Sequence, residues 1–456
     1  MTHTSFPRRV LDVPEAAPPS ELPASPAVVA GPFVFVGSTS ASNWTDGLPE
    51  GARPRPGLPY SDGNPVLLET REIYRKLDAA LQAGGSSFEE TVQINQWLAS
   101  YHGDVERDGP ERDQHALFWE KWRSIIVPCL DARNEFILDQ RPASCAMPVD
   151  RLLCSDSTVE VQIVGLVEGC GITKRAYEHD VHMPLGGYSI GMESGPFLFT
   201  AGFIPTNFVT GAADGVAVPD HIWYGNRTYN EVAETLRQLK VTVEAGNGRW
   251  EDTVKATVYV TPLALRNLPA IDAAFQRFWP ENPPARAIVP VTGIGGLNDG
   301  NIEIYLTVAR PEFGGEKTPI HTDKALPALG YAPQAVKSGP LLYLSTVQGR
   351  TPDGAPPSHA VNDRTFPFFG RSVREEVRLI QENINSICEA AGTSIDQAVK
   401  TELYFNDFAD LSAALPVWAD AFTDGYPASG FFEGFPHLNE VPGCRLTVDM
   451  VVACPD

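Results

Sequence analysis

Two carboxylates, one guanidinium and one thiol stand in sequence contexts where a side chain could do chemistry. Glu160 and Glu303 each lie between β-branched residues in strand-like segments, where a carboxylate is rarely left unpaired. Arg286 follows a Pro-Ala dipeptide, and another Pro-Ala dipeptide precedes Ser144 and Cys145. A planar guanidinium can clamp a carboxylate, and a carboxylate can orient a water or shuttle protons. A structural ion pair is the alternative for Arg286 and Glu303, and a small buried thiol is the alternative for Cys145.

The elements that must position these residues occur three times. A Gly-Pro dipeptide followed by an apolar strand begins at Gly31, Gly195 and Gly339. Each copy leads to an amphipathic helix that ends in Ala-Gly, at Gly84, Gly246 and Gly392. The two glycines are 53, 51 and 53 residues apart in the three copies. This period is too long for a solenoid and indicates a duplicated small domain.

The repeats predict three domains of roughly 140 residues, each able to bury a core of its own. Their expected bounds are 28–168, 175–312 and 325–456, after a disordered or extended arm at 1–27 that is rich in Pro and Ala. Each domain has the order strand, strand, helix, strand, helix, strand, strand, and the second helix of the first domain is expected at about 112–126. A mixed sheet with two helices on one face satisfies this order, so we expect an α+β fold. The bare face of each sheet must be covered, and the sister domains are the nearest candidates.

The composition narrows the class of partner. The chain has 35 Lys and Arg against 57 Asp and Glu, a net charge of −22, which disfavours nucleic acids and anionic membranes. Its seven cysteines include no Cys-x-x-Cys pair, and no apolar run approaches membrane-spanning length. We therefore expect a cytoplasmic protein with reduced thiols. His179 and His182 have no third ligand at a plausible spacing, so no metal or other cofactor is expected.

The repeated motifs resemble those of a known family. They are the Gly-Pro strand, the helix ending in Ala-Gly, a strand with the pattern Lys-x-Thr-x-Tyr, Pro-Ala-Arg, and a closing strand with a central Glu. The second domain matches best, at Val254–Val260, Pro284–Arg286 and Ile302–Ile304. Together these motifs resemble the RidA (YjgF) family of reactive-intermediate deaminases over nearly the whole chain after residue 26. The resemblance implies a chorismate-mutase-like α+β fold whose single-domain members form homotrimers with pockets between neighbours. Three such domains would make a pseudo-threefold covalent trimer, present as a monomer or a dimer of chains.

In the second domain the resemblance implies a role for three residues. Arg286 matches the arginine that holds a substrate carboxylate, and Glu303 matches the glutamate that places a water. Tyr188 matches an aromatic residue that often lines the pocket. The resemblance implies no metal.

The other two domains depart from the family motif. Ser144 and Ser429 stand where the arginine belongs, and Thr447 replaces the glutamate of the third domain. The first domain retains Glu160. A second possible cleft with other chemistry therefore combines Glu160, Ser144 and Cys145.

The resemblance implies a metal-free hydrolase or deaminase that acts on a small carboxylated enamine, imine or related C–N compound. Two alternatives stay open. One is a chorismatase-like hydrolase of an enolpyruvyl ether, because fold does not fix function. The other is a non-catalytic scaffold that binds a small ligand.

Overall fold

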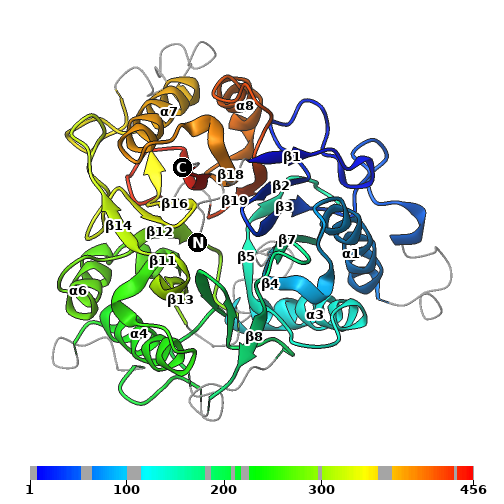
Figure 1. Cartoon of the computed structure of the whole chain (residues 1–456), viewed down its shortest axis with the longest axis horizontal. Helices are drawn as coiled ribbons and strands as arrows, with labels where there is room; N and C mark the ends of the chain where they lie inside the picture. Colours follow the sequence, from blue (N-terminus) through cyan, green and yellow to red (C-terminus); the bar gives the residue numbers. More distant parts are fainter. Residues whose placement is uncertain are drawn as a thin grey trace.

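The computed structural model describes residues 8–52, 64–99, 114–179, 186–206, 211–216, 225–295, 300–357, 372–435 and 439–454, with the backbone alone at 51, 114–121 and 372. In this part of the chain three β-sheets surround a common centre, and helices cover the outer face of each sheet (Figure 1). We call each sheet with its helices a unit. Unit one is blue and cyan, unit two is green, and unit three runs from yellow to red.

Unit one has a six-stranded sheet in the order β1-β2-β3-β7-β4-β5. Its strands are β1 (Arg9–Leu11), β2 (Ala27–Ala30), β3 (Phe33–Thr39), β4 (Thr91–Ala99), β5 (Ala143–Val149) and β7 (Val159–Leu166). Helices α1 (Pro65–Ala83) and α3 (Gln114–Phe136) pack on it. Helix α3 ends at Phe136 rather than near the predicted Ile126, and it accommodates Pro128 in its interior. A proline there normally kinks or ends a helix, but α3 continues for two more turns.

Unit two repeats the arrangement with the order β12-β11-β13-β10-β9-β8. Its strands are β8 (Lys174–Tyr177), β9 (Gly191–Ser194), β10 (Phe197–Thr200), β11 (Thr253–Val260), β12 (Ala285–Pro290) and β13 (Ile302–Ala309). Its helices are α4 (Arg227–Ala245), the short α5 (Pro262–Leu265) and α6 (Leu268–Phe278). Strand β11 is central, because it pairs in parallel with β12 and antiparallel with β13. The sheet is therefore mixed, as the sequence predicts.

Unit three has the strand order β14-β15-β16-β20-β18-β19-β6, with β17 paired to β20. Its strands are β14 (Lys317–Ile320), β15 (Ala335–Ser338), β16 (Leu341–Leu344), β17 (Val347–Gln348), β18 (Ala398–Phe405), β19 (Ala428–Glu433) and β20 (Leu446–Ala453). Helices α7 (Ser372–Ala390) and α8 (Leu411–Ala419) cover it. Strand β6 (Arg151–Leu152) comes from the part of the chain that forms unit one, so this sheet is completed by its neighbour.

The first long helix of each unit is held by the same two devices. Its apolar stripe is buried against the sheet, as at Leu77, Leu236 and Ile380. In addition, the fifth residue of each helix is a buried glutamate. Its carboxylate accepts a hydrogen bond from a backbone N–H just before the last strand of the unit. The three pairs are Thr158 to Glu69 (2.7 Å), Asn301 to Glu231 (2.9 Å) and Arg445 to Glu376 (2.8 Å). The glutamate therefore fixes the helix to the last strand in all three units.

The inner faces of the three sheets meet in layers. Phe33, Phe197 and Leu341, which follow the three Gly-Pro dipeptides, share one apolar cluster. Trp97 packs on Tyr259 and Tyr404, with ring centroids 5.8 and 5.7 Å apart. These three aromatic residues occupy equivalent positions in β4, β11 and β18. The inner sheet faces are thus buried against one another.

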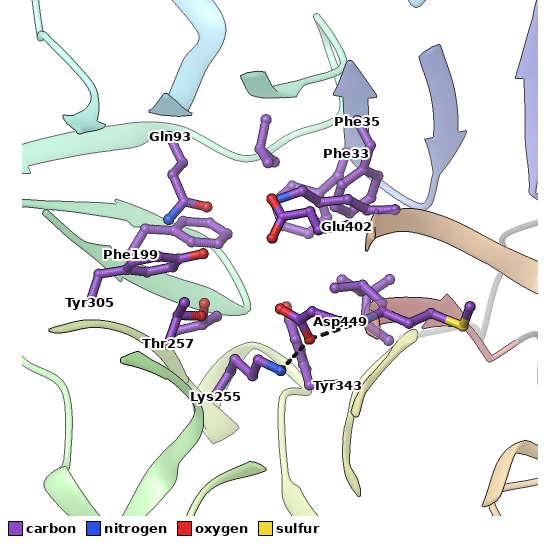
Figure 2. A pocket seen from close by; sticks show the side chains of 16 residues that line it. Phe33, Phe35, Gln93, Phe199, Lys255, Thr257, Tyr305, Tyr343, Glu402 and Asp449 are labelled. Carbon is purple, nitrogen blue, oxygen red and sulfur yellow. Dashed lines mark hydrogen bonds and ion pairs between the residues drawn. The ribbon is translucent and has the colours of Figure 1, made fainter. Parts of the chain in front are cut away.

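A cavity of about 40 Å³, whose wall includes four charged side chains, lies between the sheets (Figure 2). We call it the axial cavity. Lys255 forms an ion pair with Asp449 at 2.5 Å, and Lys400 forms one with Glu402 at 2.9 Å. Gln93 occupies the corresponding position of unit one. Each charge in the axial cavity therefore has a partner of opposite sign within the chain.

The segment expected to be a disordered or extended arm is ordered from residue 8 onward. Strand β1 pairs with β2, and Arg8 donates to the carbonyl of Ala398 at 2.7 Å. Ser25 forms a bridge to Ala428 at the edge of unit three. Backbone pairing at both places outweighs the low β-propensity of a Pro- and Ala-rich segment. Residues 8–26 therefore connect units one and three, and residues 1–7 lie outside the described part.

Candidate functional site

A pocket with a volume of about 500 Å³ lies between unit one and unit two. We call it the Glu303 pocket. Four residues singled out from the sequence lie in its wall: Ser144, Cys145, Tyr188 and Glu303. The remaining wall residues come mainly from α3, β4, β5 and the loop after β10: Gln96, Trp122, Arg123, Ile126, Val127, Leu130, Ala146, Gly186, Gly202, Ile204 and Gly295. The pocket has an apolar helix on one side and polar strand residues on the other.

Glu303 is buried on β13 but reaches the pocket with 7% of its surface exposed. Burial raises the pKa of its carboxyl to about 8, although a hydrogen bond with Cys145 acts in the opposite direction. The Cys145 thiol donates to Glu303 Oε1 at 3.0 Å. Burial also raises the pKa of Cys145 well above its usual value, so this thiol is not an activated nucleophile. Glu303 therefore keeps its proton to a higher pH than an exposed glutamate does, and it can donate that proton.

Gly202 makes room for that carboxyl group. A Cβ atom at residue 202 would lie 1.9 Å from Glu303 Oε1 and 2.9 Å from Cys145 Sγ. The matching residues after the other two Gly-Pro strands are Ser38 and Thr346. Of these three positions only residue 202 is a glycine, and it leaves space in front of Glu303.

Ser144 lies deeper in the pocket wall on strand β5. Its Oγ accepts hydrogen bonds from Arg133 at 3.1 Å and from Gln96 at 3.3 Å. Arg133 comes from α3, from the part of the helix beyond its predicted end, and is 2% exposed. Gln96 accepts in turn from the thiol of Cys129 at 3.3 Å. A buried network thus fixes the orientation of the Ser144 side chain.

The structure does not bring Arg286 into the Glu303 pocket. Its guanidinium forms an ion pair with Asp272 of α6 at 2.6 Å and lies over the Phe275 ring, 5.2 Å from the centroid. It also donates to the carbonyl of Leu329, in the connection to unit three. Burial raises the pKa of nearby Glu440 to about 7, and the Arg286 charge opposes this rise. Arg286 therefore already has Asp272 as its ion-pair partner, and Glu440 lies nearby.

The strand register explains why Arg286 and Glu303 are separated. Arg286 lies opposite Ala256 of β11, whereas Glu303 lies opposite Tyr259 on the other side of the same strand. Residues 256 and 259 are an odd number apart, so their side chains face opposite sides of the sheet. Arg286 accordingly faces the helices of unit two, and Glu303 faces unit one. The expectation that they act in one cleft does not fit this register.

The junction between units three and one holds Ser429 and Glu160 but little space. The cavity beside Ser429 has a volume of about 20 Å³, and residues 16–26 of the N-terminal segment form part of its wall. Ser38 donates to Glu160 at 2.5 Å, and burial raises the pKa of Glu160 to about 7. Glu160 is thus not in the wall of the Glu303 pocket, and the structure separates it from Ser144 and Cys145. The possible second cleft of Glu160, Ser144 and Cys145 is therefore not formed.

The junction between units two and three is also filled. Thr447, at the position of Glu303, accepts a hydrogen bond from Gln348 at 2.7 Å and donates one to Asn439 at 2.7 Å. The cavity beside Thr346 measures about 20 Å³ and is partly walled by residues 326–329. Of these three cavities, only the Glu303 pocket is large enough for a small organic molecule.

Two further properties bear on the class of site. Among the described residues, no group of three His, Cys, Asp or Glu side chains is arranged to hold a metal ion. His179 shares a hydrogen bond with Thr242 at 2.7 Å, and His182 lies outside the described residues. None of the described helices is both long enough and apolar enough to cross a membrane.

Sequence reasoning missed Arg133, Gln96 and Gly202. An alignment of the three copies would reveal Gly202, because Ser38 and Thr346 occupy its position. Gln96 and Arg133 carry no comparable signal, since they meet Ser144 only through the packing of α3 on β4 and β5.

Known proteins similar to this chain agree on one family. The family model described as Endoribonuclease L-PSP matches residues 180–310 and 322–440, which fall in units two and three. The chain is 29% identical over 157 residues to Reactive Intermediate Deaminase A, chloroplastic, of Arabidopsis thaliana, covering 32% of this chain and 78% of that protein. It is 31% identical over 112 residues to a RutC family protein of Saccharolobus solfataricus, covering 25% of this chain and 80% of that protein.

The chain is also similar to parts of solved structures. RidA from an Antarctic Psychrobacter bacterium is 27% identical, with a TM-score of 0.24, and the match covers 30% of this chain and 98% of that one. A chorismatase is 14% identical, with a TM-score of 0.48, and the match covers 80% of this chain and 93% of that one. With its repeated α+β units and these relatives, the chain belongs to the Endoribonuclease L-PSP family, which includes the RidA and RutC proteins.

Proposed function

We propose that this protein is a hydrolytic deaminase of a small carboxylated enamine or imine, and that the reaction occurs in the Glu303 pocket. The observation that carries the proposal is the position of Glu303, a protonated acid in the wall of a pocket of about 500 Å³. The name of the Arabidopsis relative, a reactive intermediate deaminase, supports the reaction class. Arg286 is left out of the proposed site, because Asp272 already neutralises it.

The proposed reaction uses Glu303 twice. As an acid it protonates the β-carbon of the enamine, which converts the C=C–N group into an iminium ion. As a carboxylate it then takes a proton from the water that adds to the iminium carbon. Collapse of this adduct releases ammonia and leaves a 2-oxo acid. The overall change is enamine plus water to 2-oxo acid plus ammonia, so the reaction requires no redox partner.

We further propose that the three units act as a covalent equivalent of a homotrimer. Matching backbone hydrogen bonds between units support this idea: Gly202 N–H to the Ser144 carbonyl at 3.1 Å, and Thr346 N–H to the Arg286 carbonyl at 3.0 Å. Linked units have effective concentrations on the order of millimolar for one another, so further trimerisation is unnecessary. Light scattering should therefore give the mass of one chain or two. A trimer of chains would contradict the proposal.

The test compares two matched glutamates. Glu303→Gln keeps the shape of the side chain but removes its acid, so turnover should fall by about 10²–10⁴-fold. Glu160→Gln makes the same change at the equivalent position of unit one, where the side chain is outside the Glu303 pocket, and should leave turnover unchanged. The assay follows ammonia and 2-oxo acid released from an enamine generated in situ from a 2-amino acid.

The proposal fails if Glu303→Gln keeps full activity, or if Glu160→Gln is the variant that loses it. It also fails if the parent protein binds small carboxylates but releases no ammonia from any enamine offered. The last result would favour a ligand-binding scaffold. Hydrolysis of an enolpyruvyl ether by the parent protein would instead favour a chorismatase-like activity.

A further inference from the structure

Among the residues that the structure describes, Arg133 is a buried cation whose hydrogen-bond partners are all neutral. Its guanidinium donates to Ser144 Oγ at 3.1 Å, to the Gly187 carbonyl at 3.1 Å and to the Gly186 carbonyl. Among the side chains that the structure describes, no carboxylate forms an ion pair with it. Burial lowers the pKa of Arg133, and Tyr74 and Cys129 act in the opposite direction. Burying an unpaired charge is costly, so this guanidinium would be stabilised by an anion nearby.

The contrast with Arg286 is informative. Both side chains are almost fully buried, and each lies on the face of its sheet that the helices cover. In each unit the edge strand of that sheet, β5 or β12, contacts the next unit. Arg286 has Asp272 as its counter-ion within the chain. Arg133 has none among the described side chains, and its hydrogen-bond partners Ser144 and Gly186 line an open pocket. The charge that Arg133 lacks can therefore come from a molecule in that pocket.

The hydroxyl group of Ser144 connects Arg133 to the pocket. A serine oxygen accepts two hydrogen bonds and donates one. Arg133 and Gln96 both donate to Ser144 Oγ, which occupies its two acceptor sites. The remaining hydroxyl proton is then free to be donated to a group in the pocket. Donation from a guanidinium polarises the hydroxyl group and makes it a stronger donor, particularly to an anion.

The surroundings add positive charge. Arg141 lies close enough for its charge to oppose that of Arg133. Arg123, ten residues earlier on α3, stands exposed in the pocket wall. Glu303, the acid in this wall, is uncharged at neutral pH because burial raises its pKa to about 8. In and around the described part of the pocket wall, positive side chains thus outnumber negative ones, although the chain carries a net charge of −22.

We propose that the Ser144 hydroxyl, held and polarised by Arg133, is the anion subsite of the Glu303 pocket and takes the carboxylate of a small 2-oxo or 2-imino acid. This inference rests on the proposed function and names the part of the site that selects the substrate. Ser144 touches the ligand, and Arg133 is a positioning residue that acts through it. A helix arginine thereby replaces the strand arginine that is absent at residue 144.

Binding experiments test the subsite without requiring turnover. Calorimetry on the full chain uses pyruvate as the anionic probe and pyruvamide as a neutral probe of the same shape. Ser144→Ala should weaken pyruvate binding by roughly 10- to 100-fold, the loss of one hydrogen bond to a charged group, and should change pyruvamide binding much less. Ser429→Ala is the matched control, because residue 429 holds the same position in the filled junction. It should leave both affinities unchanged.

Arg133 is tested by rescue. Arg133→Ala should weaken pyruvate binding at least as much as Ser144→Ala, and Arg123→Ala should weaken it less. The double variant Arg133→Ala/Ser144→Arg returns a guanidinium from the strand side and should recover most of the pyruvate affinity. A purely structural role of Arg133 would not be rescued in this way. If Arg133→Ala does not fold, Arg133→Lys decides, because lysine keeps the charge but loses the forked donors and should still weaken binding.

The inference is overturned if Ser144→Ala binds pyruvate like the parent protein, or if it weakens pyruvate and pyruvamide equally. It is also overturned if the parent protein binds none of pyruvate, oxamate and succinate. If Glu303→Gln loses turnover but still binds pyruvate, the result supports both the anion subsite and the proposed reaction. Normal pyruvate binding without any turnover in the parent protein would uphold the subsite and remove the deaminase function.

Discussion

Gly202→Ala tests whether the position of the Glu303 carboxyl group controls activity. The new Cβ would lie 1.9 Å from Glu303 Oε1, whereas ordinary contacts begin at about 3.4 Å. The carboxyl group must therefore move away by more than 1 Å, since the backbone around residue 202 is fixed by the hydrogen bond from its N–H to the Ser144 carbonyl. This movement also breaks the hydrogen bond with Cys145.

Two costs follow from that displacement. The lost Cys145 hydrogen bond and the forced side-chain conformation should lower the free energy of unfolding by about 1–3 kcal/mol. A catalytic group displaced by about 1 Å can lose about 10²-fold in rate. We therefore expect a folded protein whose kcat for enamine hydrolysis falls by about 100-fold, with a smaller change in pyruvate affinity.

The assay combines kcat with chemical denaturation, and two controls make it specific. Ser38→Gly is the reverse change at the equivalent residue of unit one and should not affect turnover. Gly202→Ala combined with Glu303→Gln should be no slower than Glu303→Gln alone, because both changes act on one group. Full activity of Gly202→Ala, or additive losses in the double variant, would refute the idea that Gly202 acts through Glu303.

Three further predictions concern stability and are read by chemical denaturation. Burial raises the pKa of Glu303 to about 8 and the pKa values of Glu69, Glu160 and Glu376 to about 7. The native state therefore keeps protons that the unfolded chain loses near pH 4.5. These groups should lower the free energy of unfolding as pH rises from about 5 to about 8, and a steady increase over that range would contradict them. Lys255→Met leaves Asp449 without its ion-pair partner in the axial cavity and should lower the free energy of unfolding by about 3–5 kcal/mol. The double variant Lys255→Met/Asp449→Leu should recover most of this loss. Equal losses in the single and the double variant would argue against the pair. Asn226→Ala removes the N-cap of α4, whose side chain accepts a hydrogen bond from Tyr229 N–H at 3.1 Å, and should lower the free energy of unfolding by about 1 kcal/mol. Asn64→Ala, at the matching cap of α1, should have the same effect. No change in either variant would mean that the caps contribute nothing.

The sequence predicts much of the fold because the repeated motifs are local. In the structure, each Gly-Pro strand, amphipathic helix and closing strand forms at the residues whose sequence pattern predicts it. The spacing of 53, 51 and 53 residues also indicates that the three copies share one architecture. The mutual burial of the sheet faces follows from amphipathicity alone. The N-terminal segment is the exception, since its order depends on contacts with Ala398 and Ala428, which are distant in sequence.

The candidate site is less predictable for a physical reason. Arg286 and Glu303 belong to one unit and to one family motif, but the register across β11 directs them to opposite faces of the sheet. A parallel register such as that of β11 and β12 cannot be read from one sequence. The Glu303 pocket instead combines Glu303 of unit two with Ser144 of unit one, a pairing that depends on how the units pack. Arg133 escapes notice because α3 continues past Pro128, where a helix would be expected to end.

A crystal structure of the protein with a bound 2-oxo acid such as pyruvate shows directly whether the working site lies between units one and two. We predict density for the ligand in the Glu303 pocket, with its carboxylate at Ser144 Oγ and its oxo group facing Glu303. Ligand bound beside Arg286, or in the axial cavity, with the Glu303 pocket empty, would contradict the account.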